Sequence, residues 1–202
     1  MKFPRSFLKL IENLKKLPGI GEKTAEKSAF TIVKNKKILE DLINSLNEIK
    51  ELKLCLKCHT ISEKEICDIC SDIQRDKIIM VVESPYDMFH IERLGVYNGK
   101  YHVIGGLISP IEGIEPNNLF IDDLRNRIFE EDILEVIIGL SPSVEGDATS
   151  YYIYEKIKDI KVNITQIARG IPTGYEIIYA DSITLQKAIL SRQPFNPWFV
   201  QV

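Results

Sequence analysis

The four cysteines of the chain form two closely spaced pairs, Cys55-Leu-Lys-Cys58 and Cys67-Asp-Ile-Cys70. A Cys-x2-Cys knuckle places two thiolates on one tight turn, and two knuckles supply the four sulfur ligands that Zn2+ takes in closed structural sites. Only eight residues separate the pairs, so the connection must be a tight hairpin. We predict one structural zinc ion held by all four cysteines. Such an ion stabilises a small module and has no open coordination position for catalysis.

Two disulfides, or four buried thiols, are the alternatives to this zinc site. Nothing resembles a signal peptide, and the composition is typical of an intracellular protein, in which disulfides are rare. No run approaches the ~20 apolar residues of a membrane span. His59 offers an alternative ligand, but the cysteines already fill the shell. We therefore expect a cytoplasmic zinc protein that does not contact a membrane.

The charge of the chain is distributed unevenly between its beginning and the rest. Residues 1–37 contain ten lysines and arginines against three glutamates, a net charge of +7. The remaining residues contain 16 basic and 26 acidic side chains, a net charge of −10. A basic arm on an acidic body suggests that the arm meets a polyanion, although a solvated, lysine-rich helical face would look the same.

Within the basic arm, Leu17-Pro-Gly-Ile-Gly21 interrupts a helical pattern, because proline and two glycines do not fit inside a stable helix. Gly19 and Gly21 would let the backbone approach a phosphate, and the helix that follows presents free N–H groups. Lys23 and Lys27 are four residues apart and share a helix face beside the turn. These residues predict a phosphate clamp of the helix-hairpin-helix type that binds DNA without regard to sequence. An ordinary connection with surface lysines is the alternative.

Three helices are expected before the cysteines, over residues 6–16, 22–34 and 36–52, with Ser6 as the N-cap of the first. The residues expected to face inward are Phe7, Leu10, Ile11, Leu14, Ala25, Ala29, Ile32, Val33, Ile38, Leu39, Leu42, Ile43, Leu46 and Ile49.

After the cysteines, short apolar runs alternate with helical patterns. Strands are expected at 78–82, near 101–104, at 136–138 and near 162–166, and helices at about 86–94, 117–130, 146–158 and 182–192. This alternation predicts an α/β layer with a mainly parallel sheet.

Three carboxylates follow the expected strands. Glu83 comes directly after the first strand, and Glu145-Gly146-Asp147 follows the strand at 136–138. The carboxyl ends of parallel strands meet at one edge of a sheet, so these groups could hold a Mg2+ ion there. Gly146 would let the chain turn into the next helix, and Asp147 would suit that helix's first turn. Solvated loop acids or helix caps are the alternative. No Walker A or Rossmann glycine motif is present.

The order of these motifs resembles the RecR family of bacterial recombination mediators over essentially the whole chain. The matching segments are Leu17–Gly21, the four-cysteine module, Val81–Pro85, Leu107–Ile114, Ser141–Thr149 and Arg169–Gly174. The resemblance implies that the α/β part is a Toprim domain, with Glu83, Glu145 and Asp147 at its acidic positions. It also implies that Lys23 and Lys27 stand at basic positions that contact DNA. Glu22 departs from the family pattern, in which proline is frequent at this place.

The resemblance further implies a function without catalysis. Members of this family act with RecO, and in many bacteria RecF, to help load RecA onto single-stranded DNA, and they assemble into dimeric or tetrameric rings.

The expected fold is a multi-module α+β chain with a helix-hairpin-helix region at 1–53, a four-cysteine zinc module at 54–76, a Toprim domain at 77–168 and a C-terminal oligomerisation segment at 169–202. The acidic edge is expected to bind a basic partner such as RecO, or weakly Mg2+. A Mg2+-dependent nuclease or primase-like phosphoryl transferase is the rival hypothesis, and a zinc-stabilised interaction module without DNA affinity is a third.

Overall fold

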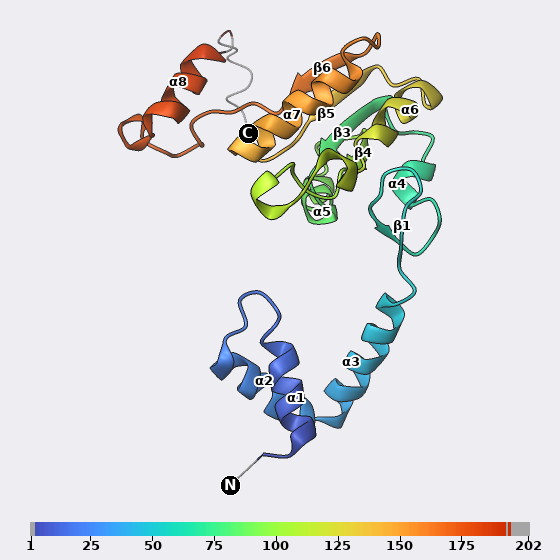
Figure 1. The fold of residues 1–202 in the computed structure, drawn as a ribbon, viewed down its shortest axis with the longest axis vertical. Helices are drawn as coiled ribbons and strands as arrows, with labels where there is room; N and C mark the ends of the chain where they lie inside the picture. Colours follow the sequence, from blue (N-terminus) through green and yellow to red (C-terminus); the bar gives the residue numbers. More distant parts are fainter. Residues whose placement is uncertain (1–2, 193, 195–202) are drawn as a thin grey trace. The chain divides into compact units, whose positions relative to one another are not determined.

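The structure of the protein is a computed structural model that describes residues 3–192 and 194. The chain divides into two compact units, Met1–Leu52 and Lys53–Val202. The first unit is helical and contains α1 (Arg5–Leu14), α2 (Glu22–Lys34) and α3 (Lys36–Ile49) (Figure 1). The last residues of the predicted segment 169–202 lie outside the described part of the chain.

A small apolar core holds α1 against α2. Phe7 and Ile11 of α1 are buried against Ala25 and Ala29 of α2, as predicted, and both alanines are completely buried. Small side chains at these two positions let the helix backbones come close together. The prediction that Ser6 caps α1 is wrong, because the helix begins at Arg5 and its N-cap is Pro4. The carbonyl of Pro4 accepts hydrogen bonds from the third and fourth residues that follow it.

The apolar stripe of α3 is not covered by the described residues of the first unit, contrary to the prediction that it faces a core. Its six apolar side chains are 36–60% exposed, and Val33 at the end of α2 is 57% exposed. The helix itself is well defined, since the Asn35 side chain accepts hydrogen bonds from the N–H groups of Lys37 and Ile38. The predicted helix is therefore confirmed, but periodicity does not reveal what covers an apolar face.

The second unit begins with the cysteine module and continues as an α/β layer. The module contains the antiparallel strands β1 (Lys53–Leu54) and β2 (Ile61–Ser62) and the short helix α4 (Asp68–Ser71). The strands of the main sheet are β3 (Ile78–Val82), β4 (Lys100–Val103), β5 (Glu135–Ile138) and β6 (Asn163–Gln166). They are all parallel, in the order β4-β3-β5-β6, which confirms the predicted fold class. The longer helices of this unit are α5 (Pro85–Leu94), α6 (Asp122–Glu130), α7 (Val144–Ile157) and α8 (Ser182–Leu190).

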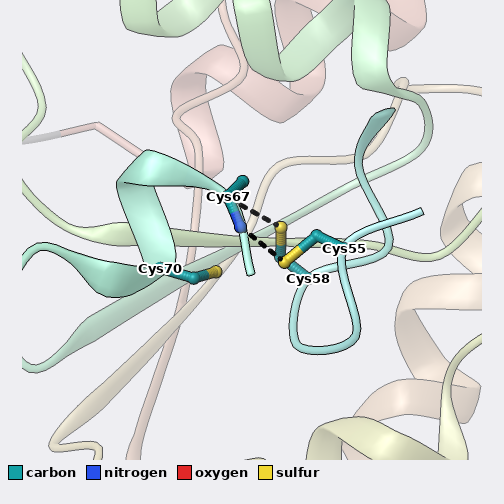
Figure 2. A group of neighbouring side chains, drawn as sticks. All are labelled: Cys55, Cys58, Cys67 and Cys70. Atoms are coloured by element: carbon teal, nitrogen blue, oxygen red, sulfur yellow. Dashed lines mark hydrogen bonds between the residues drawn. The ribbon is translucent and has the colours of Figure 1, made fainter. Parts of the chain in front are cut away.

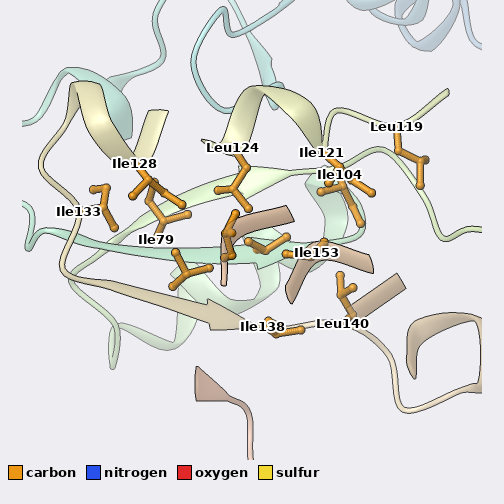
Figure 3. Packing of buried hydrophobic residues seen from close by; sticks show 13 residues of the cluster. Ile79, Ile104, Leu119, Ile121, Leu124, Ile128, Ile133, Ile138, Leu140 and Ile153 are labelled. Carbon is orange, nitrogen blue, oxygen red and sulfur yellow. The ribbon is translucent and has the colours of Figure 1, made fainter. Parts of the chain in front are cut away.

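Alternate residues of the central strand β3 face two separate apolar clusters. Ile79 and Val81 pack with α6 and α7, where Leu124 and Ile153 are completely buried (Figure 3). Met80 and Val82 face the other side of the sheet, toward Met88 of α5 and the side chains of β4. Both faces of β3 are thus covered, which explains why its sequence is a continuous apolar run.

The helix predicted at 117–130 begins later, at Asp122. Pro116–Asn118 instead forms a short 3-10 turn, and Leu119 after it is extended, with φ −111° and ψ 149°. The preceding loop is also ordered: Ser109 and Ile114 exchange two backbone hydrogen bonds of 3.0 and 2.9 Å. Proline begins 3-10 turns as well as α-helices, so this signal alone places the start of the helix too early.

Candidate nucleic-acid interface and metal centre

The link between α1 and α2 is a sharp turn that requires a glycine. The N–H of Ile20 donates to the carbonyl of Leu17 at 3.2 Å, and Gly19 has φ +79°. These values describe a type II turn, with Pro18 and Gly19 at its two central positions. A residue with a side chain is strained at this positive φ. The sequence Pro-Gly therefore fixes the direction in which the chain enters α2.

The surface beside this turn is open to a ligand. A Cβ atom added to Gly19 or Gly21 would meet nothing within 4 Å. Gly21 is the N-cap of α2, and no side chain caps the helix. The first N–H groups of a helix have no acceptor inside the helix, and the helix dipole favours an anion there. The geometry is suited to binding a phosphate group through the backbone.

Positive side chains flank this helix N-terminus. Lys23 and Lys27 are both exposed and lie on adjacent turns of α2. Among the described residues, neither lysine forms an ion pair, so both charges are available to an external anion. Glu22 lies between the turn and these lysines, and its carboxylate is 3.7 Å from the Nζ of Lys15. Lys15 thus offsets part of the negative charge that Glu22 brings to the interface.

The four cysteines converge on one point, as the spacing predicted. Their Sγ atoms all lie within 4.8 Å of one another, and all four residues are buried (Figure 2). The Sγ atoms of Cys58 and Cys67 are 3.6 Å apart, close to the edge of about 3.8 Å expected for a tetrahedron with Zn–S bonds of about 2.3 Å. None of the cysteines forms a disulfide. The donor set fits a structural zinc ion.

Local backbone geometry shapes each knuckle. The N–H of Cys67 donates to the Sγ of Cys55 at 3.3 Å, a contact that favours a thiolate. In the first knuckle, the N–H of Cys55 donates to the carbonyl of Thr60, and His59 adopts φ +59°. Hydrogen bonds to Cys67 and Cys70, with burial, raise the pKa of the Cys58 thiol. Four thiolates at this spacing repel one another, so a bound cation is what allows all of them to ionise.

His59 does not join the sulfur cluster. Its ring stacks on Phe120 with 4.1 Å between centroids and meets the His102 ring edge-on at 5.3 Å. Its Nε2 lies 3.1 Å from an Asp123 carboxylate oxygen but lacks hydrogen-bond geometry. Burial lowers the pKa of His59. The ring therefore packs the zinc module against the α/β layer.

The three predicted carboxylates are at the carboxyl edge of the sheet, where Glu83 follows β3 and the other two follow β5. The only group of three or more potential metal ligands within the described residues is the cysteine cluster. Glu83 accepts a hydrogen bond of 3.2 Å from the Ser141 hydroxyl. Glu145 and Asp147 lie in the first turn of α7, as predicted for Asp147. A Mg2+ ion at this edge stays a prediction.

Asp147 has partners that the sequence did not suggest. Its carboxylate pairs with the guanidinium of Arg169 and lies 3.3 Å from the Nζ of Lys187 on α8. The bond from Arg169 lowers the pKa of Asp147. These partners are 22 and 40 residues away in the chain, so no local spacing could reveal them.

Gly146 has a different role from the one predicted. It lies inside α7 rather than in a turn leading to the helix, and Ser143 is the N-cap, accepting from the Gly146 N–H at 3.0 Å. A Cβ on Gly146 would overlap the carbonyl oxygen of Ser141. The glycine is needed because the backbone passes too close for any side chain.

These features define a class of protein: a helix-hairpin-helix motif and a four-cysteine zinc site combined with a parallel α/β domain. Family models match each part in turn: "RecR, helix-hairpin-helix" over residues 7–49, the zinc finger domain of RecR with its four cysteines over 52–72, "Toprim domain" over 77–168 and "RecR, C-terminal" over 170–193. The chain belongs to the RecR family of recombination proteins, which confirms the resemblance inferred from its motifs.

Full-length relatives support this assignment. "Recombination protein RecR" of Thermus thermophilus is 41% identical over 96% of this chain and 100% of its own length. The protein of the same name from Cytophaga hutchinsonii is 44% identical over 97% of this chain and 98% of its own. That of Rubrobacter xylanophilus is 40% identical over 95% and 98%. Within the described residues, no helix has the length and apolar character that a membrane span requires.

Proposed function

We propose that this protein is a DNA-binding recombination mediator that acts with RecO, and with RecF where present, to help load RecA onto single-stranded DNA. The observation that carries the proposal is the hairpin of the first unit. It combines an uncapped helix N-terminus, two glycines with open space beside them, and two lysines that form no ion pair with other described residues. Such a site recognises the phosphate backbone and leaves the bases unread. A mediator that must act on any sequence needs this type of contact.

The function we propose is assembly rather than turnover. Asp147 is occupied by two cations of its own chain, and the acidic side chains described by the structure are not gathered into a metal cluster. Both observations favour a scaffold over the rival Mg2+-dependent nuclease or primase-like transferase. The zinc ion in turn would stabilise the module in which it lies and take no part in a reaction.

The direct test is binding to a labelled single-stranded oligonucleotide, alone and with RecO, in a salt titration. We expect affinity to fall as salt increases, because phosphate contacts release counterions. With Mg2+ present, the oligonucleotide should remain intact on a gel. Salt-independent binding, or cleavage that is abolished in a Glu83→Gln variant, would contradict the proposal.

We further propose that the acidic sheet edge receives a basic surface of RecO. Glu83 and Glu145 provide negative charge there, since neither forms an ion pair with another described residue, and the pair between Asp147 and Arg169 shows that the edge accepts a guanidinium. Complementary charge of this kind favours encounter and correct orientation of partners. Capture of RecO by immobilised Glu83→Ala and Asp147→Ala variants tests this step, and normal capture would count against it.

Self-association is the remaining part of the proposal. The exposed apolar stripe of α3 and the neighbouring groove lined by Phe3, Phe7, Leu10, Phe30 and Val33 belong to the same helical unit. The groove has a volume of about 430 Å³. Helical faces of this kind are buried by another copy in dimers, and dimers that associate through a second surface can close into a ring.

A further inference from the structure

Arg127 on α6 is a charged side chain buried beside the zinc site, with only 4% of its surface exposed. Its Nε donates to Glu131 at 2.7 Å, its Nη1 donates to the carbonyl of Tyr101, and its Nη2 donates to the Sγ of Cys70 at 3.4 Å. The guanidinium therefore joins three separate elements: its own helix, the strand β4 and the second cysteine knuckle. No local pattern indicates this contact, because Arg127 and Cys70 are 57 residues apart.

The charges of Arg127, Glu131 and the groups paired with Glu131 sum to zero when the cysteines hold a divalent metal as thiolates. A Zn2+ ion with four thiolates carries a charge of −2, and Glu131 adds −1. Three cations face this group: Arg127, Lys100 with its Nζ 2.5 Å from Glu131, and Lys57 at 3.8 Å from the same carboxylate. The sum is zero.

The same contacts complete the edge of the main sheet. β4 is an edge strand, and its residues 101 and 103 direct their backbone groups away from β3. The Tyr101 carbonyl accepts from Arg127, and the Val103 N–H donates at 2.9 Å to the carbonyl of Cys58. Groups next to the sulfur cluster therefore satisfy an edge that would otherwise be open to another strand.

We propose that Arg127 is a positioning residue of the zinc centre. It holds the Cys70 thiolate in place by a charged hydrogen bond and links the metal site to the backbone of β4 in the Toprim domain. This role is independent of whether the hairpin binds DNA.

The test is the rate at which zinc passes from the purified, metal-loaded protein to a chromogenic chelator. An Arg127→Met variant should release zinc about 10–100-fold faster, because removal of a group that orients a metal ligand typically lowers metal affinity by about that factor. An Arg127→Lys variant keeps the charge but loses the fork of donors, so its rate should lie between those of Arg127→Met and the parent. Arg125→Met is the matched control. Arg125 lies on the same helix, and its guanidinium binds Asp159 at 2.6 and 2.7 Å on the surface.

A spectroscopic measurement separates this role from a general loss of stability. With Co2+ in place of zinc, loss of the hydrogen bond to Cys70 should shift the thiolate-to-metal charge-transfer band to lower energy. Arg127→Lys should shift it less, and Arg125→Met should leave it unchanged. Glu131→Gln, which weakens the support of the guanidinium without removing its bond to sulfur, should shift the band less than Arg127→Met. If Arg127→Met fails to fold with metal, Arg127→Lys carries the test. The proposal would be overturned if the variants that fold released zinc at the same rate as the parent and had a charge-transfer band at the same energy.

Discussion

At the scale of single residues, the glycines show two distinct physical reasons for having no side chain. Gly19 is required by its positive φ in a type II turn, whereas Gly146 is required by the carbonyl of Ser141, which occupies the place of a Cβ. The first reason is visible in the sequence Pro-Gly. The second is not, because it depends on how the loop before α7 packs against the helix.

Replacement of Gly146 by alanine should therefore destabilise the protein, against the usual trend. Alanine is favoured over glycine inside a helix by about 1 kcal/mol. Here the added Cβ would displace the backbone at Ser141. The substitution should therefore lower the free energy of unfolding by about 1–3 kcal/mol, as in other overpacked sites. Urea denaturation followed by circular dichroism measures this change.

The matched control is Ala148→Gly, at an exposed position in the same part of α7. It should lower stability by about 1 kcal/mol through helix propensity alone. Helix propensity predicts a gain of stability for Gly146→Ala and a loss for Ala148→Gly, so it cannot explain a loss in both variants. If Gly146→Ala were more stable than the parent, the close contact with Ser141 would not constrain the helix.

At the scale of elements, the sequence predicted the helices and strands well where periodicity and a boundary signal agree. The strand Ile78–Val82 and the helix Glu22–Lys34 appear within the expected limits. The four cysteines also converge as predicted, because their spacing is local. The pairing of Asp147 with Arg169 and Lys187 depends on how distant segments fold back, and no pattern in the sequence encodes it.

The α3 helix shows a second limit of sequence analysis. A stripe of Ile38, Leu39, Leu42, Ile43 and neighbouring residues predicts one buried face, but the structure leaves that face exposed. The pattern gives no information on whether the partner is the same chain or another copy. The proposed self-association would bury this face against another copy.

Substitution of Leu42 and Leu46 by glutamate should weaken the proposed self-association. Each buried leucine contributes about 1.5–3 kcal/mol, so removal of both should weaken self-association at least about 100-fold. Light scattering after gel filtration should then give a lower mass than that of the parent, in the limit the 23.1 kDa of a monomer. Asn44→Glu with Asn47→Glu adds the same charge to this helix outside the apolar stripe and should leave the mass of the assembly unchanged. If the leucine double variant and the asparagine double variant had assemblies of equal mass, that result would contradict a role for this face.

At the scale of the whole molecule, the parts of the chain differ in charge and in the presence of the zinc module. Positive charge is concentrated in residues 1–37, with a net charge of +7, and the remainder has a net charge of −10. The basic unit presents the hairpin, and the acidic unit contains the zinc module and the Toprim sheet. Under the proposed function, the basic unit would hold a polyanion and the acidic unit would offer a surface to basic partners.

The central claim is that the hairpin of the first unit binds DNA through phosphate contacts, and one comparison tests it most directly. Fluorescence anisotropy with single-stranded DNA should be measured as a function of salt for Lys23→Glu/Lys27→Glu and for Lys36→Glu/Lys37→Glu. Both pairs lie in the basic arm and change its charge equally, but only the first lies beside the turn. Each phosphate contact contributes about 0.7 to the slope of log affinity against log salt on single strands. We predict that the first pair weakens binding and lowers that slope by about 1.4, because two such contacts are lost, while the second pair has a much smaller effect. Equal effects of the two pairs, or no effect of either, would contradict the account.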